Sequence, residues 1–387
     1  MPAFLPLSRG PRMTDNRTRH SLQDGHSLQR WHRLRTSPRF PFVLFLGLLV
    51  AGGLFQVYCY WWGVRIQRAM IRTGGSVQRM NIYPNSLKAL LPPNWLDPME
   101  PIVAASIFNQ KPMSVQEMSL LEGLPFLRSL SLGRELSFDG WLHIGNLKHL
   151  EEVQINYWNR FVLDADLERL SRLKHLNQVF FNGATIEFSG LRHLAALSHL
   201  ESITMSSCSP LDDKTDHQPL SEFASSASLK QLGFAQCSGN IDRQLLAMTS
   251  SLPEGTAPLP NLRILKLNLT RITDAGLANL KYLSSLVHLD LSETKVTSEG
   301  LRQLKSLPNL KTLYLAHCSL SQKEVAVLAE MHNLESLNIE SASLSEESLM
   351  QLASLPRLRR FRITYAHPSV LSKVQHRLPP GCKFVHY

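Results

Sequence analysis

The C-terminal part of the chain repeats with a period of 24 residues, and this periodicity limits the fold more than any other feature. Four consecutive segments align without gaps: LPNLRILKLNLTRITDAGLANLKYL (259–283), LSSLVHLDLSETKVTSEGLRQLKSL (283–307), LPNLKTLYLAHCSLSQKEVAVLAEM (307–331) and MHNLESLNIESASLSEESLMQLASL (331–355). Each follows the pattern L-x-x-L-x-L and then L-x-x-L, with similar apolar residues at some positions. A unit this short cannot bury its own leucines, so neighbouring units must stack and share one continuous core.

Within one unit, the spacing of the apolar residues predicts a strand followed by a helix. Leu262, Leu265 and Leu267 fit the inner face of a short strand, because side chains alternate between the two faces of a strand. Leu277 and Leu280 lie three residues apart, as on the buried stripe of a helix. We therefore expect an α/β solenoid that is curved, with a parallel sheet on its concave face and helices on its convex face.

Looser copies of the unit extend the predicted solenoid over residues 100–387. They contain FLRSLSLG, HLEEVQIN, HLNQVFFNG, HLESITMSS, SLKQLGFAQ and RLRRFRIT, and they bring the total to about ten to eleven units with a closing C-terminal strand. The spacing widens at 206–228 and 249–258, where Ser, Pro, Asp and Gly are frequent. This composition is typical of loops, so we interpret both segments as insertions on the convex side or the edge.

The residues between the strand leucines should face away from the core, where structural need does not fix their identity. The outward positions at the middle of successive strands are Ser131, Gln154, Phe180, Thr204, Gly233, Lys266, Asp290, Tyr314, Asn338 and Arg362. Exposed aromatic residues are favoured as interface anchors, which draws attention to Phe180 and Tyr314. The candidate partner-binding residues are Tyr157, Phe180, Lys266, His288, Asp290, Tyr314, Asn338 and Arg362.

The segment RITDAGLANL (271–280) combines an acid, a hydroxyl and a glycine, which together could form a phosphate or metal site. In its counterparts KVTSEGLRQL, SLSQKEVAVL and SLSEESLMQL, Asp274 is replaced by Ser298, Gln322 and Glu346, and Gly276 by Gly300, Glu324 and Ser348, so none of them keeps the acid and the glycine together. The hydroxyl is retained in all four copies, as Thr273, Thr297, Ser321 and Ser345. These residues are predicted N-caps, which accept hydrogen bonds from the first free N–H groups of each helix.

Residues 40–64, FPFVLFLGLLVAGGLFQVYCYWWGV, carry no charge and end in a cluster of Tyr and Trp. About 20 apolar residues span a bilayer, and aromatic residues gather at its surface, so we predict a transmembrane helix. A cleaved signal peptide is the rival interpretation, although the apolar run exceeds its usual length of about 7–15 residues. Arginines of the preceding tail favour a cytoplasmic N-terminus and an extracytoplasmic repeat domain, periplasmic in a bacterium.

The net charge of +10 is concentrated in the N-terminal tail. Residues 1–39 hold eight Arg and two Asp, so a net charge of only +4 is left to the rest of the chain. This distribution does not favour a nucleic-acid-binding body. The predicted layout is a basic cytoplasmic tail (1–39), the transmembrane helix (40–64), a juxtamembrane pre-repeat segment or N-terminal cap (65–99) and the solenoid (100–387). The pre-repeat segment is too short for an independent catalytic domain.

The sequence offers no persuasive catalytic, cofactor or metal site, and we expect none. It contains no Gly-rich phosphate loop, no H-E-x-x-H and no G-x-S-x-G. The five cysteines lack zinc-site spacing, and the acidic run PLDDKTDHQP (210–219) lacks the Gly and closing Glu of a calcium loop. Cysteines such as Cys208 and Cys237 are interpreted as core residues, while a disulfide between these two remains open if the repeats lie outside the cytoplasm.

The combination ITDAGL with the 24-residue period resembles the leucine-rich-repeat proteins with Thr-Asp-x-Gly-Leu turns that are abundant in planctomycete-type bacteria. The segment from Gly74-Gly75 through SVQRMNIY to LPPNWL, and the ending RLPPGCKFVHY, are similar to the regions that flank the repeats in such proteins. The resemblance implies a binding role and supplies no catalytic residues.

Two functions from different classes are therefore weighed. The first is a non-catalytic, membrane-anchored protein whose repeats bind a protein or a surface polymer through the concave face. The alternative is an intracellular adaptor such as a ubiquitin-ligase substrate receptor. It would need an F-box-like segment before the repeats, for which SLKALLPPNWL (86–96) is a faint candidate.

Overall fold

The computed structural model describes residues 54, 64–69, 75–79, 102–107, 115–133, 138–211, 220–250, 257–340, 344–364 and 368–386. The chain divides into two units, Met1–Tyr60 and Trp61–Tyr387, and the repeats form the second. Of the predicted membrane span, only Leu54 and Val64 lie among the described residues. Within the described ranges, no helix is both long and apolar enough to cross a bilayer.

The described part of the second unit is one sheet with helices packed against it. Its strands are β1 (Ser76–Arg79), β2 (Ile102–Ile107), β3 (Ser129–Leu132), β4 (Glu152–Val162), β5 (Gln178–Ile186), β6 (Ser202–Ser206), β7 (Ser209–Pro210), β8 (Gln231–Ala235), β9 (Ile264–Lys266), β10 (His288–Asp290), β11 (Thr312–Leu315), β12 (Ser336–Glu340), β13 (Arg360–Thr364) and β14 (Lys383–His386).

The helices alternate with the strands along the chain. They are α5 (Val115–Glu122), α6 (Phe138–Gly145), α7 (Asp164–Leu170), η2 (Phe188–Gly190), α8 (Leu191–Ala195), α9 (Leu220–Phe223), α10 (Ile241–Ser250), α11 (Asp274–Asn279), η3 (Leu280–Tyr282), α12 (Ser298–Leu304), α13 (Gln322–Ala329), α14 (Glu346–Ala353) and α15 (Pro368–Arg377).

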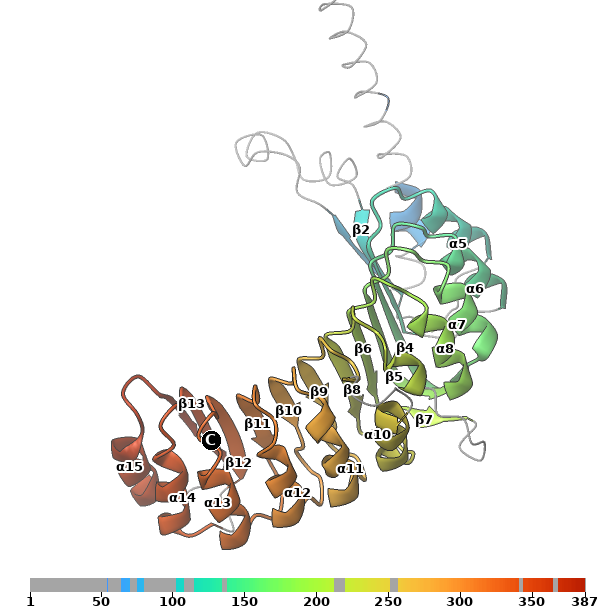
Figure 1. The fold of residues 1–387 in the computed structure, drawn as a ribbon. Coiled ribbons are helices and arrows are strands. Elements are labelled where there is room, and N and C mark those ends of the chain that lie inside the picture. Colours follow the sequence, from blue (N-terminus) through green and yellow to red (C-terminus); the bar gives the residue numbers. More distant parts are fainter. Residues whose placement is uncertain are drawn as a thin grey trace, which may run out of the picture. The chain divides into compact units, whose positions relative to one another are not determined.

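From β2 onward, neighbouring strands of the main ladder pair in parallel and follow chain order, whereas β1 pairs antiparallel with β2 at the N-terminal edge. Figure 1 shows the strands along the inner, concave side of the second unit and the helices along the outer side. The predicted α/β solenoid with a parallel sheet is therefore confirmed.

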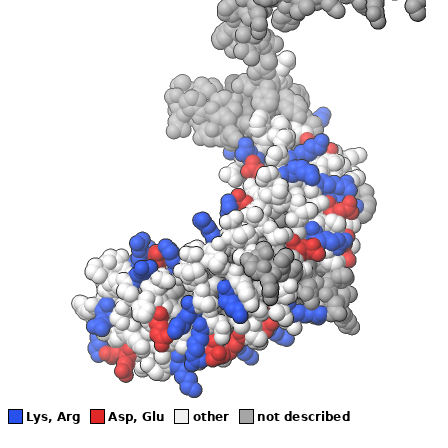
Figure 2. Space-filling view, in the orientation of Figure 1, with Lys and Arg blue, Asp and Glu red and all other residues white. Residues whose placement is uncertain are grey.

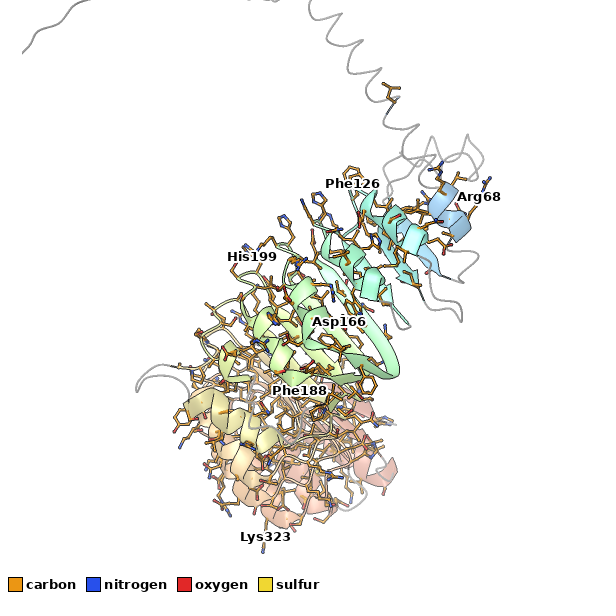
Figure 3. All side chains as sticks on the ribbon, turned by 90° about the vertical axis from the view of Figure 1, so that its right-hand side faces the viewer. Arg68, Phe126, Asp166, Phe188, His199 and Lys323 are labelled. Carbon is orange, nitrogen blue, oxygen red and sulfur yellow. The ribbon has the colours of Figure 1, made fainter. Side chains whose placement is uncertain are left out.

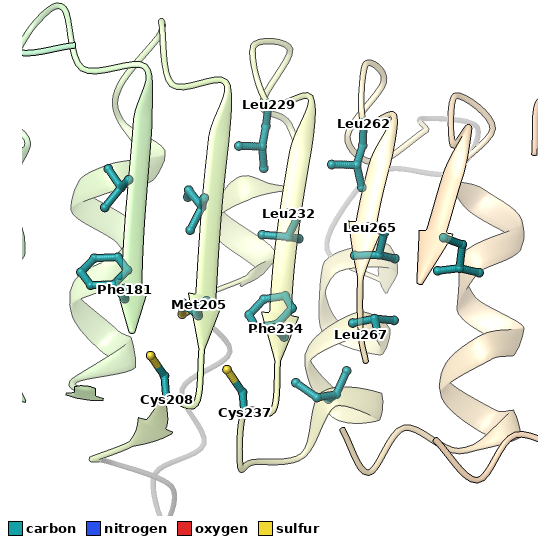
Figure 4. Packing of buried hydrophobic residues seen from close by; sticks show 14 of the residues in the cluster. Phe181, Met205, Cys208, Leu229, Leu232, Phe234, Cys237, Leu262, Leu265 and Leu267 are labelled. Atoms are coloured by element: carbon teal, nitrogen blue, oxygen red, sulfur yellow. The ribbon is translucent and has the colours of Figure 1, made fainter. Parts of the chain in front are cut away.

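The core lies between the sheet and the helices, where the repeated leucines predicted it. Leu262, Leu265 and Leu267 are completely buried. On the strands before them, Phe181, Met205 and Phe234 lie at one level of the ladder, and their side chains fill the same layer (Figure 4). Each strand thus buries alternate side chains on the core side.

The predicted N-caps are confirmed at all four positions. The hydroxyl oxygens of Thr273, Thr297, Ser321 and Ser345 accept from backbone N–H groups in the first turns of α11, α12, α13 and α14. Each cap satisfies a donor that the helix itself leaves without a partner.

The acid beside the cap links two repeats, which the sequence did not predict. The Asp274 carboxylate accepts from the backbone N–H (3.0 Å) and the hydroxyl (2.6 Å) of Thr297, one repeat further on. Asp242 binds Thr273 in the same way. The glycine of the motif leaves room for this carboxylate, because a Cβ at Gly300 would lie 2.2 Å from Asp274 Oδ1.

The insertion at 206–228 is not simply a loop, as the sequence suggested. Its start forms β7, which pairs with the end of β5, and its second half contains α9. The last residues of β4 and β5 also pair with each other, which extends the sheet beside β7. Val162 and Ile186 in these last residues are fully buried, so the extension is held in the core. Residues 212–219 and 251–256 lie outside the described residues.

Cys208 and Cys237 are buried in equivalent turns of neighbouring repeats and are not disulfide-bonded (Figure 4). A hydrogen bond between the two thiols lowers the pKa of Cys208 and raises the pKa of Cys237. Cys318 is also buried, and its thiol donates to the carbonyl oxygen of Leu291. These cysteines pack as small core residues, as predicted.

Candidate functional site

The concave face of the sheet carries a row of side chains that run across all the repeats. The strand register aligns Ser106, Ser131, Gln154, Phe180, Thr204, Gly233, Lys266, Asp290, Tyr314, Asn338, Arg362 and Val385, which we call the middle row. The ten outward positions derived from the sequence thus fall on one line.

Another row lies two residues earlier in each strand and faces the same way, and we call it the first row. It contains Ala104, Ser129, Glu152, Gln178, Ser202, Gln231, Ile264, His288, Thr312, Ser336, Arg360 and Lys383. His288, the one candidate of this row chosen from the sequence, is therefore accompanied by two cations, Arg360 and Lys383, that the sequence reasoning missed. Strand alternation could have identified both, because Arg360 stands two residues before Arg362 and Lys383 two residues before Val385.

In the N-terminal half, the polar side chains of the face bind one another. Ser131 Oγ lies 3.4 Å from Gln154 Oε1, and Asn156 Nδ2 donates to Ser131 Oγ at 3.3 Å. Asn182 Nδ2 donates in turn to Asn156 Oδ1 at 3.4 Å. Phe180 is half-buried beside this network, as the aromatic member of the middle row in β5.

Tyr157, another aromatic candidate, does not belong to the middle row. It follows Asn156 in β4, where the register with β5 shifts before pairing resumes at Arg160. Its side chain lies outside the described residues, and so does Tyr365. The sequence could not predict this shift, because the apolar alternation gives no sign of an irregular ladder.

In the C-terminal half, an aromatic pair bridges β10 and β11. The rings of His288 and Tyr314 meet edge to face, with centroids 4.8 Å apart and planes at 81°. This geometry is favoured between aromatic rings. Both residues are half-buried, so the pair presents a partly exposed apolar surface on a face that is mostly polar.

The charges around this pair set the protonation of His288. Burial lowers the pKa of His288 below 6.5, and the charges of Lys266 and Arg360 lower it further, while Asp290 opposes them. Asp290 Oδ1 also accepts from the backbone N–H of Ser292 at 3.0 Å, which fixes the carboxylate. The His288 ring is therefore neutral at neutral pH.

Asn338 and Arg362 complete the candidates on β12 and β13. Asn338 Oδ1 is buried and has no hydrogen-bond partner among the described residues. An acceptor in this state loses the full free energy of its hydration, so a donor that reaches it from a ligand would be favourable. Arg362 is exposed.

Neither His317 nor the acidic run at 210–219 belongs to the two rows of the face. His317 lies in the turn after β11, exposed and with a positive φ of 56°. Most of the acidic run at 210–219 is outside the described residues. Within the described part of the chain, no group of three or more His, Cys, Asp or Glu is placed to hold a metal ion.

Comparison with known proteins agrees with this architecture. Residues 260–320 match the protein family described as "Leucine rich repeat". No curated protein sequence is similar enough to the chain to be identified as a relative.

Solved structures give weak similarities of fold. An internalin (inlF) from Listeria monocytogenes has 16% sequence identity and a TM-score of 0.45, over 73% of this chain and 79% of that chain. An internalin C2 from the same organism has 21% identity and a TM-score of 0.39, over 64% and 84%. TLR13 in its complex with ssRNA13 has 18% identity and a TM-score of 0.42, over 66% and 35%.

These similarities say nothing about the ligand of this chain. The family match covers the most regular repeats, and the strand register continues the same unit on both sides of them. Residues 260–320 are therefore leucine-rich repeats, within a longer solenoid of the same strand-and-helix unit.

Proposed function

We propose that this chain is a non-catalytic, membrane-anchored binding protein whose concave face holds a protein partner or a surface polymer. Leucine-rich repeats provide protein-interaction surfaces, and a solenoid offers one long concave face for this purpose.

The observation that carries the proposal is the contrast between the two sides of each strand. On the core side, Leu265, Leu289 and Leu313 are completely buried. On the other side, the middle row places Lys266, Asp290 and Tyr314 only part-buried, with no described element packed over them. Packing of the core does not depend on the identity of these side chains, so they can differ from repeat to repeat and contact a partner.

Photocrosslinking tests this assignment directly. A benzophenone amino acid at position 314 stands on the concave face, whereas the same group at Tyr282 stands on the helical side, where Tyr282 is 47% exposed. We expect a specific protein adduct in cells from position 314 and none from position 282. Adducts from position 282 alone would contradict the proposal.

The membrane anchor is proposed from the sequence of residues 40–64, with the N-terminus in the cytoplasm and the repeats outside it. Protease added to intact cells, or to spheroplasts if an outer membrane is present, should digest the repeats and spare the tail. Digestion of the repeats only after lysis would contradict the proposal that the repeats lie outside the cytoplasm, and would favour the intracellular adaptor.

A further inference from the structure

The two halves of the concave face differ in charge. On β2 to β8, the first and middle rows contain hydroxyl, amide, apolar and glycine residues, with Glu152 as their one charged member. Glu152 is engaged there by Ser129 Oγ at 3.1 Å and Gln154 Nε2 at 2.6 Å. This half therefore offers a nearly uncharged surface, on which the single acid already has two hydrogen-bond donors.

On β9 to β14, the same two rows contain four cations and one acid. The cations are Lys266, Arg360, Arg362 and Lys383, and the acid is Asp290. Asp290 stands next to Lys266 in the ladder, so these two charges offset each other locally. Arg360 and Lys383 stand side by side in the first row of β13 and β14, so two exposed positive charges are adjacent there, and Arg362 is exposed as well.

Lys and Arg project from the concave side of the C-terminal repeats in Figure 2. Between the aromatic pair and the arginines, the first row carries only the small hydroxyl residues Thr312 and Ser336. Beside them in the middle row lies Asn338, with its unpartnered Oδ1. A ligand seated here would meet an apolar ring pair on one side, cations on the other and a hydrogen-bond acceptor between them.

We propose that the partner docks an acidic segment of polypeptide on this half of the face, which we call the basic half (β9–β14). The inference rests on the proposed function and names the chemistry of its partner. Carboxylates of the segment pair with Arg360 and Arg362, since the guanidinium group suits carboxylate geometry. Apolar side chains of the segment pack on His288 and Tyr314, and an N–H donor of the segment reaches Asn338 Oδ1.

A polypeptide fits these groups better than a nucleic acid. A peptide backbone offers an N–H donor to the acceptor at Asn338 at every residue, whereas the backbone of a nucleic acid has no N–H donor and only its bases carry one. The two rings contact each other edge to face, so they do not form a platform on which successive bases stack.

Fluorescence anisotropy with the purified full-length protein tests the proposal. The probes are a labelled peptide repeating Gly-Glu-Leu, its Gly-Lys-Leu and Gly-Gln-Leu counterparts, and labelled oligo(dT). We expect the acidic peptide to bind at least tenfold more tightly than the other three, with an affinity that falls as salt is raised.

Charge reversal locates the contact. The Arg360→Glu/Arg362→Glu variant should bind the acidic peptide at least tenfold more weakly than the wild type. The matched control, Lys281→Glu/Lys323→Glu, makes the same charge change on the helical side, where Lys323 points away from the sheet (Figure 3). It should leave binding unchanged, and circular dichroism should show both variants folded.

Three outcomes would overturn the proposal: tighter binding of oligo(dT), equal binding of the acidic and neutral peptides, or an equal loss in both charge-reversal variants. The proposed function fails separately. If position 314 crosslinks a partner whose binding is unaffected by the Arg360→Glu/Arg362→Glu variant, the concave face binds protein but not through an acidic segment. If position 314 yields no adduct, the proposal that the concave face binds a partner loses its support.

Discussion

Asp274 shows how one side chain joins two repeats. Its carboxylate accepts from the N–H and hydroxyl of Thr297, and the missing side chain of Gly300 makes room for it. Thr297 in turn caps α12, so each bond in this group depends on the others. The Thr-Asp-x-Gly-Leu sequence is thus a joint between neighbouring units and not a ligand site.

Replacing Asp274 or Gly300 should destabilise the solenoid in a coupled way. Asp274→Ala leaves two donors of Thr297 without their acceptor and should cost about 1–2 kcal/mol. Gly300→Ala forces a Cβ against the carboxylate and should cost about 1–3 kcal/mol. The double variant should cost clearly less than both together, because the carboxylate that clashes is gone.

Denaturant unfolding of the three variants measures these costs. Glu299→Ala is the matched control, because Glu299 lies in the first turn of α12, next to Gly300. Its side chain is 63% exposed and pairs only with Arg302 in the described structure. It should change the free energy of unfolding by about 0.5 kcal/mol or less. Additive costs for Asp274→Ala and Gly300→Ala would argue against the joint.

The lowered pKa of His288 predicts a stability change in mildly acidic solution. The unfolded chain takes up a proton near pH 6.5, before the folded chain does, so this contribution is present above pH 6.5 and is lost as the pH falls through the folded pKa. NMR titration should give a midpoint below 6.5. Lys266→Met should raise this midpoint and Asp290→Asn should lower it, and a midpoint that ignores both changes would contradict the charge assignment.

At this scale the sequence predicted which column of residues caps the helices but not which neighbour the acid reaches. Thr273, Thr297, Ser321 and Ser345 recur at one position, and capping is a local interaction that the period reveals. The bond from Asp274 to Thr297 crosses between repeats. Its existence depends on how closely neighbouring helices pack, which no single unit encodes.

At the scale of elements, each repeat is a strand and a helix. It is joined to its neighbours by the strand ladder and by the bonds from an acid of one repeat to the N-cap of the next, such as Asp274 to Thr297, which we call the capping column. The apolar pattern predicted both elements, because 2-residue and roughly 3.6-residue periods separate strands from helices. The extension of β4 and β5, and the strand β7, escaped prediction. They depend on pairing between Val162, Ile186 and Pro210 of three different repeats, which their own local patterns do not show.

Deleting whole repeats tests whether the capping column controls the joint between elements. Removal of 263–286 takes out β9 and α11 and brings Asp242 to Thr297 and Gly300, which match its present partners Thr273 and Gly276. Removal of 287–310 takes out β10 and α12 and brings Asp274 to Ser321 and Glu324 instead. We expect the first deletion to keep a clearly higher melting temperature, because the second places two carboxylates where a glycine had left room.

Both deletions remove 24 residues, so chain length is matched. The first also takes out η3 and removes twelve apolar residues against eight in the second, so the difference in apolar content works against the expected result. Thermal unfolding followed by circular dichroism compares them. Equal melting temperatures would mean that leucine packing alone holds the repeats together and that the capping column contributes little.

At the scale of the molecule, the outward side chains of successive strands form one continuous face, because the strands pair in parallel and in register. The sequence predicted the middle row because each repeat offers one outward position at a fixed distance from its leucines. It did not predict the division between a nearly uncharged half and a basic half. That division needs the first row as well, and it becomes visible only when the register places Arg360 and Lys383 beside Arg362.

The central claim, that the concave face binds the partner, is tested most directly by affinity. Once crosslinking has identified the partner, its dissociation constant is measured for the wild type, for Phe180→Ala/Tyr314→Ala on the concave face, and for Leu142→Ala/Tyr282→Ala on the helical side. The second pair is a matched loss of exposed apolar surface, because Leu142 and Tyr282 are 44% and 47% exposed. The claim predicts at least a tenfold loss, about 1.4 kcal/mol, for the concave pair alone. An unchanged affinity for the concave pair, or a loss confined to the helical pair, would contradict it.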